Sequence, residues 1–235
     1  PEQIVVSTGA KQSLANVLLA LVDENDDVII PTPYWVTYSE LVKIARGKVV
    51  EIRTGVDKGF KASAEEVEAA ITPNTKAFLF SSPCNPSGAV YSREELSALV
   101  EVFKKYPQIT IISDEIYEYI NYVGEHESIA QFEDIKDRVV IVNGLSKGFA
   151  MTGWRIGYTA STVEIAKGME KLQGQFTSGT CSIAQKAGVA ALTSDLRPTQ
   201  EMAEEFTRRK KRVLELVNEI PGVICPEPDG AFYIF

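Results

Sequence analysis

Short apolar runs alternate along most of the chain with longer segments of helical periodicity. The runs near residues 27–30, 48–53, 76–81, 109–113, 138–143 and 155–160 predict buried strands, and residues 4–6 begin another. Apolar residues at Leu14, Val17, Leu18 and Leu21 predict a helix with one buried face. Because strands and helices alternate, we expect an α/β fold with a mainly parallel sheet and helices on both faces.

Polar residues mark where several helices begin. A helix is predicted over about 35–45, and a long one over about 198–219 with Pro198 near its start. A serine followed three residues later by glutamate is typical of a capping box at a helix start. This pattern occurs at Ser63 with Glu66, at Ser92 with Glu95, and at Ser161 with Glu164.

Composition narrows the classes of partner. With 235 residues, 45% of them hydrophobic, the chain can bury the core of one large domain. A net charge of −8 argues against nucleic acid or an anionic membrane surface as a partner. The basic run 208–212 shares its predicted helix with Glu201, Glu204 and Glu205, so we interpret it as a solvated face.

The cysteines and the single histidine of the chain predict a cytoplasmic location and argue against a zinc site. The three cysteines form no CxxC pair, and no signal peptide or transmembrane run is evident, which together predict a cytoplasmic protein. Cys84 is expected to be a small buried residue rather than a nucleophile. His126, the single histidine, is expected in a polar loop without partners for a catalytic triad or a zinc site.

The segment 143–155 carries the most informative chemistry. A primary amine such as that of Lys147 can form a Schiff base with an aldehyde, and the guanidinium of Arg155, eight residues later, suits a phosphate. Pyridoxal 5′-phosphate (PLP) is a cofactor that carries both an aldehyde and a phosphate. Taken alone, the segment is more typical of a solvated lysine in a glycine-rich turn.

Three further segments supply groups that this cofactor needs. Gly9 lies at a strand-to-helix turn, where a free helix start attracts anions. Asn85 lies in a loop that Pro83 and Pro86 make rigid, so its amide can be aimed at a ligand. Asp114 ends an apolar strand, where its carboxylate could pair with a protonated pyridine nitrogen or could instead cap a helix.

All four segments follow predicted strands, and each chemical group falls at or just beyond the carboxyl end of a strand. In parallel α/β sheets, ligands bind along that edge. The sequence therefore predicts a PLP site there.

The chain resembles the large domain of fold-type I, class I/II PLP-dependent aminotransferases, and bacterial aspartate aminotransferases most of all. The resemblance runs from residue 7 to about residue 235. It depends on Pro-Tyr-Trp at 33–35, Ser-Pro-Cys-Asn-Pro-Ser-Gly at 82–88, Ser-Asp-Glu-Ile-Tyr at 113–117 and Ser-Lys-Gly-Phe-Ala-Met-Thr-Gly-Trp-Arg-Ile-Gly-Tyr at 146–158. It implies a PLP-binding large domain at 1–215, the start of a C-terminal small domain at 216–235, and an antiparallel strand at 155–160.

The resemblance also implies a role for each site residue. Lys147 would bind the cofactor as a Schiff base and then act as the base that moves the substrate proton. Asp114 would keep the ring nitrogen protonated, and Tyr117 and Asn85 would hydrogen-bond the phenolic oxygen. Trp35 would stack on the ring, and Trp35 and Asn85 would also contact the substrate carboxylate. The phosphate would be held by backbone groups of Gly9, Ala10 and Lys11 and by the side chains of Ser146 and Arg155.

The implied reaction moves an amino group from an amino acid, aspartate by resemblance, to a 2-oxo acid such as 2-oxoglutarate, within a homodimer. The arginine that holds the substrate carboxylate in this family falls beyond Phe235, so we expect the chain alone to be a poor catalyst. Residues 177–185 resemble a segment near the subunit boundary, but Gly179 and Thr180 depart from the family pattern and leave its contacts open. A lyase or synthase of the same fold and a non-catalytic PLP-binding regulator are the alternatives.

Overall fold

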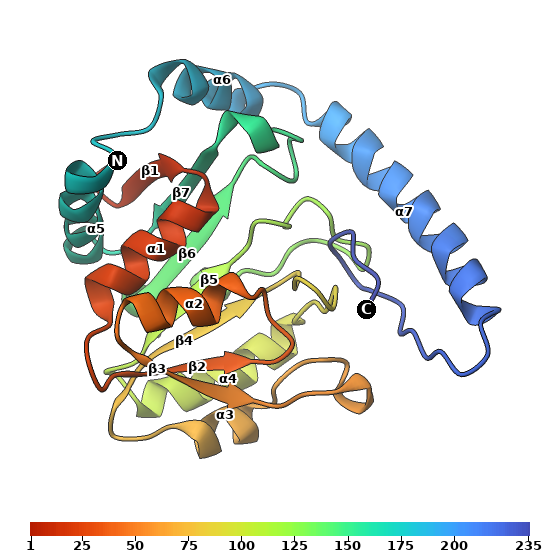
Figure 1. Ribbon diagram of the computed structural model, residues 1–235, viewed down its shortest axis with the longest axis horizontal. Helices are drawn as coiled ribbons and strands as arrows, with labels where there is room; N and C mark the ends of the chain where they lie inside the picture. Colours follow the sequence, from red (N-terminus) through yellow and green to blue (C-terminus); the bar gives the residue numbers. More distant parts are fainter.

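The computed structural model describes residues 1–235 as a seven-stranded sheet covered by helices on both faces (Figure 1). The sheet has the order β1-β7-β6-β5-β4-β2-β3, in which β7 runs antiparallel to β1 and β6 and all other pairs are parallel. The expected fold class and the antiparallel strand are therefore confirmed. The strands are β1 (Ile4–Thr8), β2 (Asp27–Pro31), β3 (Lys48–Ile52), β4 (Thr75–Ser81), β5 (Thr110–Asp114), β6 (Val139–Gly144) and β7 (Ile156–Ala160).

Two layers of helix enclose the sheet. The helices α1 (Ala10–Leu21), α2 (Thr37–Ile44) and α5 (Val163–Phe176) bury residues such as Leu14, Val42 and Met169 against one face. The helices α3 (Ala64–Ala70) and α4 (Arg93–Lys105) cover the other face, where Val67 and Phe103 belong to a second apolar cluster. Short 3-10 turns lie at Val56–Lys58, Ile129–Gln131, Lys136–Arg138 and Thr152–Trp154.

Two of the three predicted capping boxes form. The hydroxyls of Ser63 and Ser92 accept the backbone N–H groups of the glutamates three residues later, and those glutamates reach back to the serine N–H groups. The prediction at Ser161 is wrong, because α5 begins after Thr162 without a side-chain cap. The Ser161 N–H donates to the carbonyl of Gln3 at 3.0 Å, and its hydroxyl donates to the carbonyl of Thr162 at 3.2 Å. Ser161 thus still belongs to the end of the sheet.

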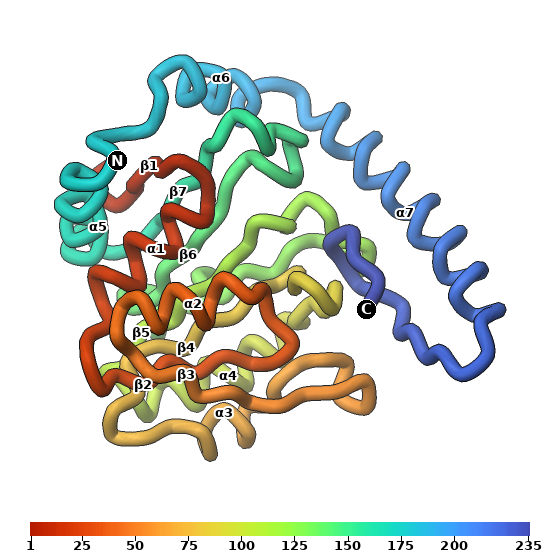
Figure 2. Tube along the Cα trace, viewed as in Figure 1, coloured from red at the N-terminus to blue at the C-terminus, as the bar shows by residue number.

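After α6 (Ser182–Thr193), the long helix α7 (Arg197–Asn218) stands apart from the sheet, and the chain then returns towards the loops at the carboxyl edge of the sheet (Figures 1 and 2). Backbone hydrogen bonds hold the returning segment 229–231. Tyr122 N–H donates to Asp229 O, Gly230 N–H to Gly88 O and Ala231 N–H to Ile120 O, each at 2.8 Å. The domain boundary at 215/216 stays a prediction.

The prediction that the basic run 208–212 is a solvated face is wrong for Lys210, whose side chain is 10% exposed, pairs with Glu227 at 2.8 Å and lies over the ring of Tyr122. Other residues of the run agree with the prediction. Glu205 pairs with Arg208 at 2.7 Å and with Arg209 at 2.8 Å, and all three side chains are exposed. None of the helices combines the length and the apolar character that a membrane span requires.

Candidate active site

A cavity of about 250 Å³ opens at the edge where β4, β5 and β6 end. Nine of the ten predicted site residues line it, and Gly9, the tenth, directly precedes its lining residue Ala10. The sheet brings these groups together because β1, β4, β5 and β6 all point the same way. The cavity is lined by Ala10, Lys11, Trp35, Tyr38, Asn85, Asp114, Ile116, Tyr117, Ser146, Lys147, Thr152, Arg155 and Tyr233.

Lys147 lies in the turn that follows β6, and its amine faces aromatic rings rather than a carboxylate. Its Nζ atom is 5.2 Å from the ring centre of Phe232 and 5.5 Å from that of Tyr117. Burial lowers the pKa of Lys147, and the charge of Arg155 lowers it further, although Asp114 acts in the opposite direction. A lowered pKa favours the neutral amine, which is the nucleophilic form. The hydroxyl of Thr152 donates to the carbonyl of Ser146 at 2.9 Å and braces this turn.

Asp114 is the last residue of β5 and is only 3% exposed. Its Oδ2 atom accepts the hydroxyl of Tyr38 at 2.7 Å, and its Oδ1 atom accepts the N–H of Ile116 at 3.2 Å. Turns follow β5 instead of a helix, so the alternative of helix capping by Asp114 is wrong. Burial raises the pKa of Asp114 to about 6, outweighing the two hydrogen bonds and Lys147, which lower it.

An anion-binding end is built from Gly9, the start of α1 and Arg155. Gly9 has φ 84, and no side chain caps α1, so the first N–H groups of the helix are free to bind a ligand. A Cβ atom on Gly9 would lie 2.2 Å from Nη2 of Arg155, which only glycine avoids. Arg155 in turn donates to the carbonyl of Thr152 at 2.8 Å. Backbone donors and a guanidinium on one wall suit a phosphate.

Sequence reasoning missed two tyrosines in the cavity. Tyr233 accepts a hydrogen bond from Nδ2 of Asn85 at 3.1 Å and shares another with the hydroxyl of Tyr117. Nothing in the spacing pointed to Tyr233, because only the returning chain brings it to the site. Tyr38 lies three residues after Trp35, and that helical spacing could have indicated a shared face.

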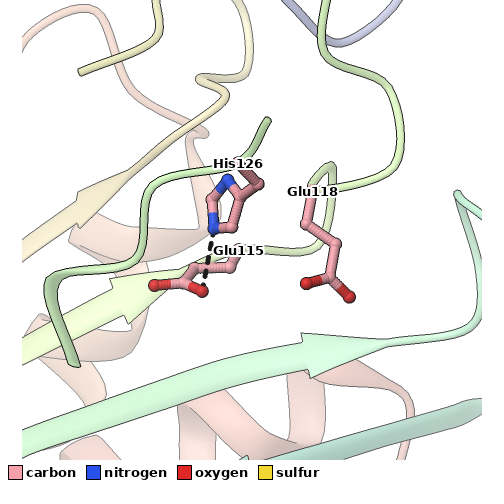
Figure 3. A group of neighbouring side chains, drawn as sticks. All are labelled: Glu115, Glu118 and His126. Atoms are coloured by element: carbon pink, nitrogen blue, oxygen red, sulfur yellow. Dashed lines mark hydrogen bonds and ion pairs between the residues drawn. The ribbon is translucent and has the colours of Figure 1, made fainter. Parts of the chain in front are cut away.

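His126 has partners, contrary to expectation, although it lies in a loop (Figure 3). Its Nε2 atom is 2.9 Å from Oε2 of Glu115, and Oε1 of Glu115 accepts the hydroxyls of Ser113 at 2.9 Å and Ser128 at 2.8 Å. Burial alone would lower the pKa of His126, but nearby carboxylates, chiefly that of Glu115, raise it. The ligand atoms of Glu115, Glu118 and His126 lie within 4.8 Å of one another. Since only Glu115 and His126 of these three are bonded to each other, we interpret Glu115, His126 and the two serines as a hydrogen-bonded network next to Asp114 in the chain.

Comparison with known families agrees with this geometry. The family model described as aminotransferase class I and II matches residues 1–235. The chain belongs to this family. The motifs at 33–35, 82–88, 113–117 and 146–158 are therefore those of a class I and II aminotransferase.

Two relatives in the aminotransferase family are similar to the chain over its whole length. The chain is 48% identical to the aspartate aminotransferase of Bacillus subtilis and 46% identical to the aspartate/prephenate aminotransferase of Cereibacter sphaeroides, over its whole length in both cases. It spans only 60% and 59% of those two proteins.

Solved aminotransferase structures have the same fold. Superposition on the aspartate aminotransferase of Rhizobium meliloti gives a TM-score of 0.97 at 45% identity, covering 99% of this chain and 59% of that one. For the Thermus thermophilus aspartate aminotransferase with maleate the TM-score is 0.95 at 43% identity, covering 100% of this chain and 61% of that one.

Proposed function

We propose that the chain is the cofactor-binding large domain of a PLP-dependent aminotransferase that moves an amino group from aspartate to a 2-oxo acid such as 2-oxoglutarate. The observation that carries the proposal is that Lys147, Asp114 and Arg155 line one cavity. The names of the relatives support aspartate as the amino donor. The maleate in a relative's structure, a four-carbon dicarboxylate, supports a dicarboxylic substrate.

The cavity residues fit the groups of the cofactor. When bound, PLP acts as an electron sink for charge that develops at the substrate Cα. The neutral amine of Lys147 would hold the cofactor through its aldehyde and would move the proton at the substrate Cα. The carboxylate of Asp114 would pair with the protonated ring nitrogen. Asn85 and Tyr117 would hydrogen-bond the phenolic oxygen.

The remaining predicted residues position the cofactor and the substrate. Trp35 would stack on the ring, and its own position is supported by Lys11, whose Nζ atom lies 4.7 Å from the indole centre. Trp35 and Asn85 would contact the substrate carboxylate. The phosphate would be held by backbone groups of Gly9, Ala10 and Lys11 and by the side chains of Ser146 and Arg155, which the uncapped start of α1 and the lining of the cavity support.

Amino-group transfer in the full-length protein tests the function. Aspartate and 2-oxoglutarate should yield glutamate, whereas release of ammonia or pyruvate would indicate a lyase of the same fold. Cofactor binding without any turnover would indicate a regulator.

Lys147→Ala is expected to abolish the absorbance band of the covalently bound cofactor, because Lys11, the other amine that lines the cavity, lies over the ring of Trp35. Absorbance spectra of the purified variant with added PLP provide the measurement. Lys167→Ala, which removes an exposed lysine of α5, should leave the band unchanged. Retention of the band in Lys147→Ala would contradict the assignment.

We also propose a homodimer and a cytoplasmic location. A hollow of about 680 Å³ beside the site is lined by exposed apolar side chains, among them Trp154 and Ile183, and by Arg155, which also lines the active-site cavity. Exposed apolar surface of this kind marks interfaces. The location is supported by Cys84, Cys181 and Cys225, which are all free thiols.

A further inference from the structure

Tyr38 joins two groups that would hold the cofactor ring. It lies in the first turn of α2 and is 1% exposed. Its hydroxyl donates to Oδ2 of Asp114 at 2.7 Å. Its ring meets the indole of Trp35 edge-on, with centres 5.9 Å apart and planes at 81°. One side chain therefore contacts both the expected partner of the ring nitrogen and the expected stacking residue.

The hydroxyl of Tyr38 is the one side-chain hydrogen-bond donor to Asp114. The second donor is the backbone N–H of Ile116, which belongs to the turn after β5. Other titratable groups influence the carboxylate only through their charge: Glu115 beside it in the chain, Lys147 after β6, Cys84 after β4 and Tyr117 in the following turn. Burial and the neighbouring carboxylate raise the pKa of Tyr38 well above its usual value, so its hydroxyl stays protonated and can always donate.

The geometry of α2 makes this contact directional. Tyr38 belongs to the apolar cluster with Leu41 and Val42, which packs α2 on the sheet. Because a close-packed ring cannot swing away, its hydroxyl stays aimed at the end of β5. A rotation of the Asp114 carboxylate away from Tyr38 would break a charge-assisted hydrogen bond at a residue that is only 3% exposed.

We propose that Tyr38 is a positioning residue, whose hydroxyl holds the Asp114 carboxylate ionised and aimed at the cofactor ring nitrogen while its ring supports Trp35. The inference rests on the proposed function, since it concerns how the same cavity holds PLP. Tyr38 itself touches Asp114 and Trp35 and acts through them.

Tyr38→Phe keeps the ring and removes only the hydroxyl. Losing one hydrogen bond to a charged group should weaken PLP binding to the cofactor-free full-length protein by about tenfold to a hundredfold. The loss should grow between about pH 8 and about pH 6, because without its donor Asp114 is protonated at higher pH and no longer pairs with the ring nitrogen. Fluorescence titration with PLP measures both quantities.

Two controls separate positioning from packing. Tyr34→Phe removes a hydroxyl that bonds the exposed Glu51 outside the cavity, at 2.6 Å, and should leave PLP affinity unchanged. A PLP analogue with carbon in place of the ring nitrogen offers nothing for Asp114 to pair with, so Tyr38→Phe should change its affinity much less than that of PLP. Equal losses for PLP and the analogue would mean that Tyr38 only packs, and would overturn the inference.

A double-mutant cycle tests the route through Asp114. In an Asp114→Asn background, Tyr38→Phe should cause no further loss of PLP affinity, because the two residues act as one unit. Additive losses overturn the proposal. Failure of the unmutated protein to bind PLP at all would instead overturn the proposed function, so the two failures are distinguishable.

If Tyr38→Phe does not fold, the contact can instead be tested with a spectroscopic label that leaves the hydroxyl of Tyr38 in place. In protein made with fluorotyrosine, one buried ring resonance should shift on Asp114→Asn and again on addition of PLP to the unmutated protein. If no tyrosine resonance responds to both changes, the contact between Tyr38 and Asp114 is not coupled to the cofactor.

Discussion

Asp114 carries a negative charge at a position almost wholly shielded from water. Burial destabilises the ionised carboxylate, and the hydroxyl of Tyr38 and the N–H of Ile116 offset only part of that cost. A buried, ionised carboxylate with a raised pKa is typical of a functional site, here one that could bind a cationic group. The same carboxylate is therefore expected to lower the stability of the cofactor-free protein while it supports cofactor binding.

Asp114→Asn should stabilise the cofactor-free protein at neutral pH. The pKa of Asp114 is about 6 in the folded state, against an ordinary value of 3.8, so folding favours the protonated form. This stabilising contribution is complete below the unfolded pKa and is lost as the pH rises through about 6. At about pH 7.5 the variant should gain on the order of 1–3 kcal/mol of unfolding free energy, and below about pH 4 it should gain nothing.

Urea unfolding at both pH values measures this gain. Asp57→Asn, at an exposed position of a 3-10 turn, should change the unfolding free energy little at either pH. If Asp114→Asn and the unmutated protein have the same unfolding free energy at neutral pH, burial of the ionised carboxylate does not destabilise the fold. The affinity of Asp114→Asn for PLP, measured by fluorescence titration, should be lower than that of the unmutated protein.

At the scale of elements, the start of α1 is set by its contact with β7. Gly157 of β7 pairs with Ser7 of β1 and with Gly144 of β6, and α1 begins directly over it. A Cβ atom on Gly157 would lie 2.2 Å from the backbone nitrogen of Ala10 and 2.4 Å from the carbonyl carbon of Gly9. The free N–H groups that would hold a phosphate therefore stand where they do because β7 lacks a side chain at this point.

Gly157→Ala should push the start of α1 away from the sheet. Overpacking of this kind costs about 1–3 kcal/mol of unfolding free energy, and the displaced N–H groups should also bind inorganic phosphate and PLP more weakly. Gly174→Ala is the matched control, since a Cβ atom at this exposed position of α5 would meet nothing within 4 Å. Equal stability and equal phosphate affinity of the two variants would refute the role of this contact.

At the scale of the whole molecule, the helices that enclose the sheet leave one flank beside the active site apolar. Ile183 of α6 is 73% exposed and Trp154 is 50% exposed, and both line the hollow next to Arg155. The segment 177–185, whose contacts the sequence left open, is anchored to β1 by the hydroxyl of Thr180, which donates to Val6 O at 3.2 Å. A second subunit seated here would lie next to the phosphate-binding end of the cavity.

Ile183→Glu should convert the proposed dimer of the full-length protein into a monomer, because it buries a charge in an apolar contact. Sedimentation velocity measures the change. Val56→Glu alters an equally apolar, half-exposed residue next to β3, at the opposite edge of the sheet, and should leave the dimer intact. A dimer that survives Ile183→Glu would place the interface elsewhere.

Much of the fold could be predicted because its signals are local. Buried strands are short apolar runs, and helices such as α4 show a one-sided apolar stripe with a capping box at Ser92. The error at Ser161 arose because the same local pattern does not say whether a serine is the N-cap of a helix or lies one residue earlier, directly after a strand. His126 was misjudged for a related reason, since its partner Glu115 becomes a neighbour only through the turn after β5.

The sequence by itself determined the alternation of strands and helices, and it placed each reactive group at the end of a strand, since both depend on neighbours along the chain. Only the tertiary structure decided that Tyr38 bonds Asp114 and that Tyr233 reaches Asn85. Those contacts join residues far apart in sequence, and no local pattern encodes them. They follow from the way helix packing and the returning C-terminal segment enclose the edge of the sheet.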